Sequence, residues 1–359
     1  MRAIRDRMPP EGSLRVNLTK SALRLDGEEH TLGHVLAAAW IGEMLETAWR
    51  ELEQQLACQA LATAEDLSIP AGQLQAAFND WRRDRDMITA DDLRRVLGDL
   101  QLELSDIVGC CKRKLIAEAS QHRHDEALSR FPVQASDVLR LLPLHVFFGY
   151  DVEEIIRGVA HRWLAPASDG PKVPDSPRCT QLLDPTEGAA ARQLFGIDEA
   201  TTPVLARHEA AYLAYRRSVV TTVALDRILE EMRPDLVRLQ LAVTTSPSNE
   251  VAREVVCCVR NDGEAMNKVG ERAELAVEPR DVLLRDAGTL PFGGRLASAK
   301  AGDVLGPAPS GAGFMVATVL SRQDPQLSHA EVRAVLENRL LDRLLGPEMV
   351  KRVSFSWQL

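Results

Sequence analysis

Three features that mark other protein classes are missing from this sequence, and each absence narrows the function. No apolar run approaches the roughly 20 residues that span a bilayer, and no Cys-X-X-Cys spacing suggests a zinc ribbon or a thioredoxin-like site. Basic residues do not balance acidic ones, since 43 Lys and Arg stand against 52 Asp and Glu, for a net charge of -9. Such a chain repels phosphate backbones, so neither nucleic acid nor a membrane is an expected partner.

The beginning of the chain and its cysteines indicate the compartment. The stretch MRAIRDRMPPEGSL is charged and lacks the apolar region of a secretory signal. Four of the six cysteines form the vicinal pairs Cys110-Cys111 and Cys257-Cys258, and Cys58 and Cys179 are isolated. Neighbouring residues on a helix point about 100° apart, which is a poor geometry for a disulfide. We therefore expect reduced thiols and a cytoplasmic protein.

Hydrophobic periodicity divides the chain into five segments. Residues 1–164 open with short strands and continue as short capped helices, which predicts a helical module. Residues 165–186 contain five prolines and predict a linker, and residues 187–235 predict a helical connector. Residues 236–323 mix strands with helices and predict a separate domain with a small antiparallel sheet. Together these patterns predict an α+β fold that is mostly helical.

The last segment, residues 324–359, combines a helix with a strand. Ser328 and Glu331 have the spacing of a capping box, and Gly346-Pro347 is a stop, so a helix is expected over 328–345. The stretch RVSFSW alternates as a strand does. Because a free edge would invite aggregation, we expect this strand to pair with LRVNL, residues 14–18, and the segment to pack on the N-terminal module.

Motifs within residues 236–322 carry a resemblance to a known family. The predicted order is strand, helix, short helix, strand, turn helix and a pair of strands. The motifs are Pro291-Phe292, Gly302-Asp303-Val304, Gly306-Pro307 and Gly313-Phe314-Met315. This segment, about a quarter of the chain, resembles a parvulin-type peptidyl-prolyl isomerase domain. With its helical module the chain is similar to SurA-like and PrsA-like foldases, and more specifically to PpiC-related proteins of bacterial peptide maturation systems.

The resemblance implies an isomerase site whose catalytic groups have been lost. In parvulins two cross-strand histidines and a nearby cysteine or aspartate form the floor of the site. Here Gln240 and Met315 stand at the histidine positions, and the acid or thiol position falls near Leu275 or Ala276. Gln240 still forms hydrogen bonds, whereas Met315 donates none. We therefore expect Gln240 to face Met315 in a peptide-binding groove with weak or absent isomerase activity.

The resemblance also implies partners and binding residues. We expect a chaperone-like protein of a RiPP-type maturation system that binds a precursor or unfolded peptide, meets other maturation enzymes and uses no cofactor and no metal. The expected peptide-binding residues are Gln240, Leu290, Phe292, Leu296, Phe314 and Met315. Phe292 is as typical of a core as of a binding site, and Met315 on a central strand is more typical of packing than of recognition. Two enzymatic alternatives stay open, a residual isomerase and a peptide-modifying enzyme with its site in the helical part.

Some residues outside this segment also have a functional interpretation. His30 and His34 could hold a metal but lack a third ligand, and residues 122–126 have metal-like letters in a polar helix face. Cys110 or Cys111 would act as a nucleophile if a histidine served as its base, although small buried thiols are the commoner case. The candidate bases are His122, His145 and His161.

Overall fold

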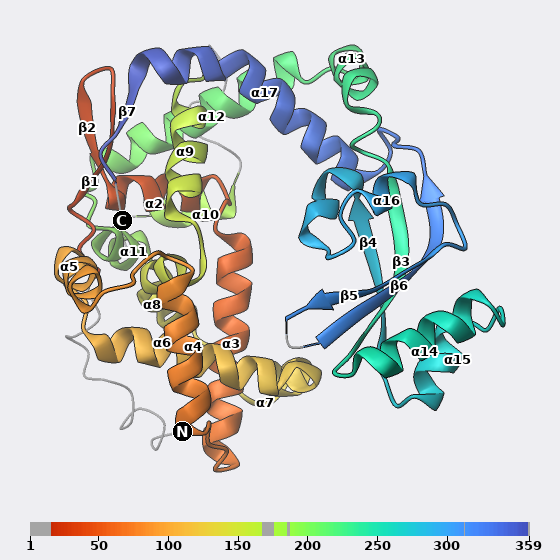
Figure 1. The fold of residues 1–359 in the computed structure, drawn as a ribbon. Helices are drawn as coiled ribbons and strands as arrows, with labels where there is room; N and C mark the ends of the chain where they lie inside the picture. The colour runs from red at the N-terminus through yellow and green to blue at the C-terminus, as the bar shows by residue number, and fades with distance from the viewer. Residues whose placement is uncertain (1–15, 167–175, 185–186, 312, 358–359) are drawn as a thin grey trace. The chain divides into compact units, whose positions relative to one another are not determined.

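The chain forms two compact units. The computed structural model describes residues 16–166, 176–184, 187–311 and 313–357. Unit 1 comprises residues 1–218 with 344–359, and unit 2 comprises residues 219–343 (Figure 1). Each unit combines helices with one small antiparallel sheet, so the predicted α+β class is confirmed. Within the described ranges, none of the helices is both long and apolar enough to cross a membrane.

The sheet of unit 1 begins with a tight hairpin. Strands β1, Ser21–Leu25, and β2, Glu28–Thr31, pair antiparallel. The turn residues between them, Asp26 and Gly27, have φ angles of 52° and 89°. Asp-Gly is a residue pair that favours such a two-residue turn, because both positions need a positive φ.

The last strand of the chain completes this sheet. Strand β7, Val353–Phe355, pairs antiparallel with β1, and the strand order is β2-β1-β7. The expected partner, residues 14–18, is wrong as far as it is described, because residues 16–18 are not in a strand. Residues 14 and 15 lie outside the described residues. Phe355 lies opposite Leu23, which is fully buried, whereas Phe355 itself is exposed.

Helices make up most of unit 1, and several start at a side-chain cap. Thr31, Thr89 and Asp151 each accept a hydrogen bond from a backbone N–H of the first turn, a group without a partner inside the helix. The helices are α2 Leu32–Ile41, α3 Glu46–Ala64, α4 Ala71–Arg83, α5 Ala90–Leu100, α6 Leu104–Ala119, α7 His124–Arg130, α8 Ala135–Gly149, α9 Val152–Trp163, α10 Pro177–Leu183, α11 Glu187–Phe195 and α12 Thr201–Val219.

Helix α2 lies at the centre of unit 1. Its sequence, LGHVLAAAWI, is apolar on all sides, and every residue except His34 is buried. A helix without a polar face needs neighbours all around it, and α2 contacts α9, α10, α11 and β1. Its alanines and Gly33 allow those neighbours to approach closely.

Part of the expected linker is packed structure. Helix α10 lies within residues 165–186, and Cys179 and Leu182 in it are fully buried in the main core of unit 1. Two buried side chains three residues apart are too short a pattern to predict a helix amid five prolines. The linker interpretation is therefore wrong for residues 177–183.

Unit 2 contains the predicted series of elements. These are α13 Thr222–Met232, β3 Arg238–Ser246, α14 Asn249–Arg260, α15 Met266–Arg272, β4 Val277–Leu283, the 3-10 helix η2 Leu284–Thr289, α16 Arg295–Ser298, β5 Val304–Ser310 and β6 Gly313–Gln323. The strands pair antiparallel in the order β4-β3-β6-β5. Odd-numbered residues of β3 pack against the η2 and α16 segment, and Ala242 packs against α14 and α15. Both faces of the sheet are thus covered within unit 2.

Helix α17, Ala330–Arg352, contributes residues to the cores of both units. Val332, Leu336 and Leu340 pack with α13 in unit 2. The predicted stop at Gly346-Pro347 is wrong, because the helix continues through it to Arg352. Met349, beyond the proline, is buried in the core of unit 1, and this packing offsets the hydrogen bond that Pro347 removes.

Candidate functional site

The two positions where the resemblance places catalytic histidines are not neighbours. Gln240 pairs with Ser321 on β6, whereas Met315 pairs with Thr245 on β3. Positions 240 and 245 of β3 are five residues apart, a distance of about 17 Å at the rise of a strand. The expectation that Gln240 faces Met315 is therefore wrong.

The two side chains also lie on opposite faces of the sheet. Met315 belongs to the apolar cluster beneath η2 and α16. Gln240 follows the parity of Ala242, which faces α14 and α15, and its Oε1 accepts a hydrogen bond from the Ser321 hydroxyl at 2.8 Å. The side chain of Gln240 thus hydrogen-bonds to β6 and is not directed toward Met315.

Four of the six expected peptide-binding residues meet in one cluster. Leu290, Phe292, Leu296 and Met315 pack together with residues of β3 and β6. Phe292 is 4% exposed and Met315 is 7% exposed. The structure therefore places these four residues in a closed core.

The remaining expected residue, Phe314, lies on the other face. It packs against the cluster formed by α14 and α15, together with Leu275, one of the two positions aligned with the family's acid or thiol. At the second such position, the backbone carbonyl of Ala276 accepts a hydrogen bond from Thr244 Oγ1 at 2.8 Å. The six residues are thus divided between two faces and do not line a common groove.

A buried polar cluster in unit 1 tests the nucleophile interpretation of Cys110. Arg113 donates a hydrogen bond from Nη2 to Cys110 Sγ at 3.0 Å, and both residues are buried on α6. Burial raises the pKa of the Cys110 thiol, although Arg113 opposes the shift. A protonated thiol that is 1% exposed is unreactive, so the structure favours the buried-thiol interpretation.

His145 of α8 is the candidate base that approaches this cluster. Burial, together with the positive charge of Arg113, lowers the pKa of His145 to about 4. Its Nε2 has no hydrogen-bond partner within the described residues and lies 3.8 Å from Glu51 Oε2. Sequence spacing could not have paired positions 113 and 145, because only the packing of α6 and α8 brings them together.

We expect His145 to make unit 1 sensitive to acid. The folded-state pKa of about 4 lies below the usual 6.5, so the unfolded chain takes up a proton first as the pH falls. Relative to pH 7.5, this group alone should lower the free energy of unfolding by about 2 kcal/mol at pH 5. All five tryptophans belong to unit 1, so urea titrations followed by tryptophan fluorescence report on that unit.

The matched variants are His145→Leu, which should lose this part of the pH dependence, and His122→Asn at an exposed position, which should keep it. Equal pH dependence in His145→Leu and the wild type would contradict the buried, neutral state of His145.

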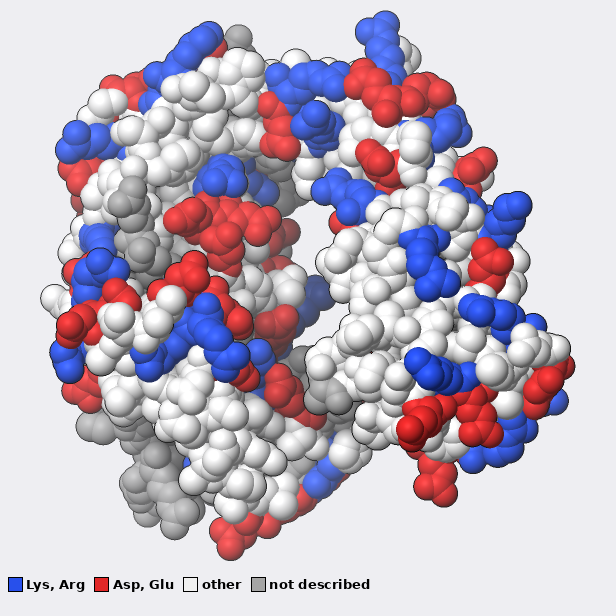
Figure 2. Space-filling model, viewed as in Figure 1, with Lys and Arg blue, Asp and Glu red and all other residues white. Residues whose placement is uncertain are grey.

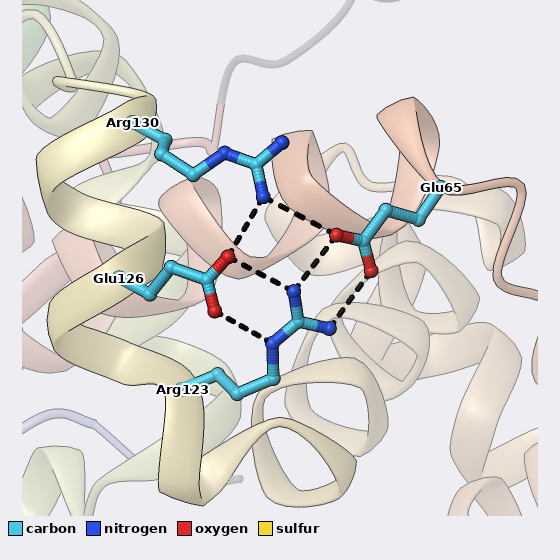
Figure 3. Close-up of polar contacts among 4 residues, drawn as sticks. All are labelled: Glu65, Arg123, Glu126 and Arg130. Carbon is cyan, nitrogen blue, oxygen red and sulfur yellow. Dashed lines mark hydrogen bonds and ion pairs between the residues drawn. The ribbon is translucent and has the colours of Figure 1, made fainter.

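Residues 122–126 resemble metal ligands in the sequence, but two of them form ion pairs in the structure. Arg123 donates hydrogen bonds to Glu65 at 2.7 and 2.8 Å and to Glu126 at 2.8 and 3.0 Å, and Arg130 bridges the same two carboxylates (Figure 3). These arginines lower the pKa of Glu126 to about 2. The network joins α7 to the end of α3. The carboxylate of Glu126 is already bound by the two arginine side chains. Acidic and basic side chains are similarly interspersed over the face drawn in Figure 2.

The side chains of the other candidate metal sites also form contacts within the protein. His34 Nδ1 accepts a hydrogen bond from the Thr31 backbone N–H, as part of the cap of α2, and the ring centres of His30 and His34 are 6.0 Å apart. Sequence analysis missed one carboxylate–thiol cluster, formed by Cys258, Asp262 and Glu264. A cation already occupies it, because the Arg272 guanidinium hydrogen-bonds Glu264 and the Cys258 sulfur.

Comparisons with known proteins identify no family for this chain. A scan against models of protein families finds no match, and a search of curated proteins finds no match either. The function must therefore be inferred from the chemistry of the chain's own residues.

Proposed function

We propose that this chain is a peptide-binding, chaperone-like protein of a bacterial, RiPP-type peptide maturation system, acting in the cytoplasm. In this proposal unit 2 is a degenerate parvulin-type domain without meaningful prolyl isomerase activity. The ligand is a precursor or unfolded peptide, and other maturation enzymes are its further partners. The parvulin likeness is supported by the order of elements in unit 2 and by the place of Pro291-Phe292 between η2 and α16.

The separation of Gln240 from Met315 is the observation that carries the absence of catalysis. Rotation about an X-Pro bond has a barrier of roughly 20 kcal/mol, and a catalyst must bind the twisted amide better than the planar one. That preference requires groups placed around one amide. Gln240 and Met315 lie on opposite faces of the sheet, and Met315 packs with buried apolar side chains.

A protease-coupled proline isomerisation assay tests the first half of the proposal. We expect the full chain to leave the isomerisation rate of an X-Pro tetrapeptide at its uncatalysed value, because Gln240 and Met315 are too far apart to act on one amide. A rate that rises in proportion to the concentration of the chain, and does not appear in a mock purification, would overturn the proposal. Fluorescence anisotropy with a labelled, permanently unfolded polypeptide tests the second half, for which saturable binding is expected.

A further inference from the structure

The strand edges of the described residues are protected against pairing, with one exception. Strand β2 carries two glutamates, β4 carries a proline between charged residues, and β5 carries two prolines. Charge, proline and short strand length are the usual means by which a free edge avoids a foreign strand, and of these β7 has only its length of three residues. Strand β7 has neither charge nor proline, since it consists of Val353, Ser354 and Phe355, and it pairs only with β1 in the described part of the chain.

A pocket of about 210 Å³ lies beside this unprotected edge. It is lined by Glu153, Ile156, Arg157, Phe355 and Trp357. The first three share one face of α9, because helix positions three and four apart are adjacent, and the last two share one side of an extended chain. Ile156 and Trp357 are buried and supply an apolar floor, whereas Phe355 is 45% exposed. The volume suits one apolar side chain and falls below that of typical small-molecule sites.

Polar groups around the pocket lack partners. The Trp357 indole is 3% exposed, yet its Nε1–H has no hydrogen-bond acceptor among the described residues. A buried donor of this kind costs free energy unless a ligand or water accepts its proton. The exposed side chains of Glu153 and Arg157 take part in no ion pair that involves the described residues. A ligand that brings charged groups would pair with Glu153 and Arg157, which line the pocket.

We infer that the β7 edge and its pocket bind an extended peptide segment, which adds as a strand beside β7 and places one apolar side chain in the pocket. This inference rests on the proposed peptide-binding function and assigns its site to unit 1. Only an extended backbone presents N–H and C=O groups that match those of a strand edge. Peptide side chains two positions apart point to the same side, about 7 Å along, so an acidic residue there reaches Arg157.

The test uses a short fluorescein-labelled peptide of alternating polar and apolar residues, with a central leucine and an aspartate two positions later. Anisotropy titrations with the full chain should show saturable binding that weakens about tenfold in Phe355→Glu and in the milder Phe355→Ser. The matched control is Val350→Glu on α17, since Val350 is 85% exposed and does not line the pocket. N-methylation of alternate peptide nitrogens should weaken binding without any change to the protein, because it removes the donors of strand pairing.

A charge exchange tests the predicted orientation. Arg157→Glu should bind the aspartate peptide several-fold more weakly and should recover when lysine replaces aspartate in the peptide. Failure of the lysine peptide to recover binding would remove Arg157 from the site.

The outcomes separate this inference from the function on which it rests. If the wild type binds the peptide and both Phe355 variants bind it equally well, the assigned site is wrong and the peptide-binding function stands. If the wild type binds neither this peptide nor an unfolded polypeptide, the proposed function itself fails. If light scattering shows a dimer that Phe355→Glu dissociates, a second copy of the chain occupies the edge and the inference is overturned.

Discussion

Replacement of Phe292 by alanine should lower the free energy of unfolding of unit 2 by about 3–5 kcal/mol, the usual cost of removing a buried aromatic ring. Phe292 is 4% exposed and packs with Leu290, Leu296 and Met315 in the apolar cluster under η2 and α16. The truncation would leave a cavity that this closed cluster cannot fill. Loss of function in Phe292→Ala would therefore reflect the folding of unit 2.

Hydrogen exchange of β3 and β6 measures this effect, since unit 2 has no tryptophan. Peptides from both strands should exchange much faster in Phe292→Ala than in the wild type. The matched control is Leu320→Ala on β6, where the side chain is 55% exposed and the expected change is within about 0.5 kcal/mol. Unchanged protection of both strands together with lost peptide binding would show instead that Phe292 lines an open groove, as the sequence alone allowed.

Replacement of Gly33 by alanine should destabilise unit 1 by about 3 kcal/mol or more. An added Cβ would lie 2.0 Å from the backbone oxygen of Phe195 and 3.3 Å from that of Leu18. The Gly33 backbone N–H also donates to Leu18 O at 2.9 Å, so α2 cannot shift away without losing this hydrogen bond. Overpacking between two backbone segments has no flexible side chain to absorb it.

Urea unfolding followed by tryptophan fluorescence measures the effect of Gly33→Ala in unit 1. Gly98→Ala is the matched control, because Gly98 also lies in a helix, α5, and an added Cβ there meets nothing within 4 Å. The Gly98→Ala variant should have a free energy of unfolding about 0.5–1 kcal/mol higher than the wild type, because alanine has the higher helix propensity. Equal stability of the two variants would contradict the close approach of α2 to residue 195.

The local sequence pattern predicted the strands of the candidate site but not how they pair. The strands that carry Gln240 and Met315 were predicted, because alternation of apolar residues is visible in a short window. Their register was not, and a one-residue shift moves every side chain of a strand to the other face. An irregularity in the pairing between Gln240 and Leu241 adds to the difficulty, since nothing in the local sequence marks it.

The predictions of helix boundaries near prolines were wrong for a related reason. Proline has a strong local preference against helix interiors, and that preference predicted a linker over 165–186 and a stop at Pro347. In the structure the burial of Cys179 and Leu182 stabilises α10, and the burial of Met349 holds the end of α17. Packing against residues distant in sequence outweighed the local preference of proline. A prediction from a short stretch of sequence cannot include those residues.

The sequence by itself determined the class of this protein, which is α+β and mostly helical, with capped helices and short strands. These properties depend on residues within a few positions of one another, so periodicity and turn chemistry reveal them. Only the tertiary structure decided which side chains meet, since it separated Gln240 from Met315 and joined Arg113 to His145. It also set residues 153–157 beside the β7 edge, a contact between segments about 200 positions apart. Such contacts depend on how all the elements of a unit pack together, a property that no single segment carries.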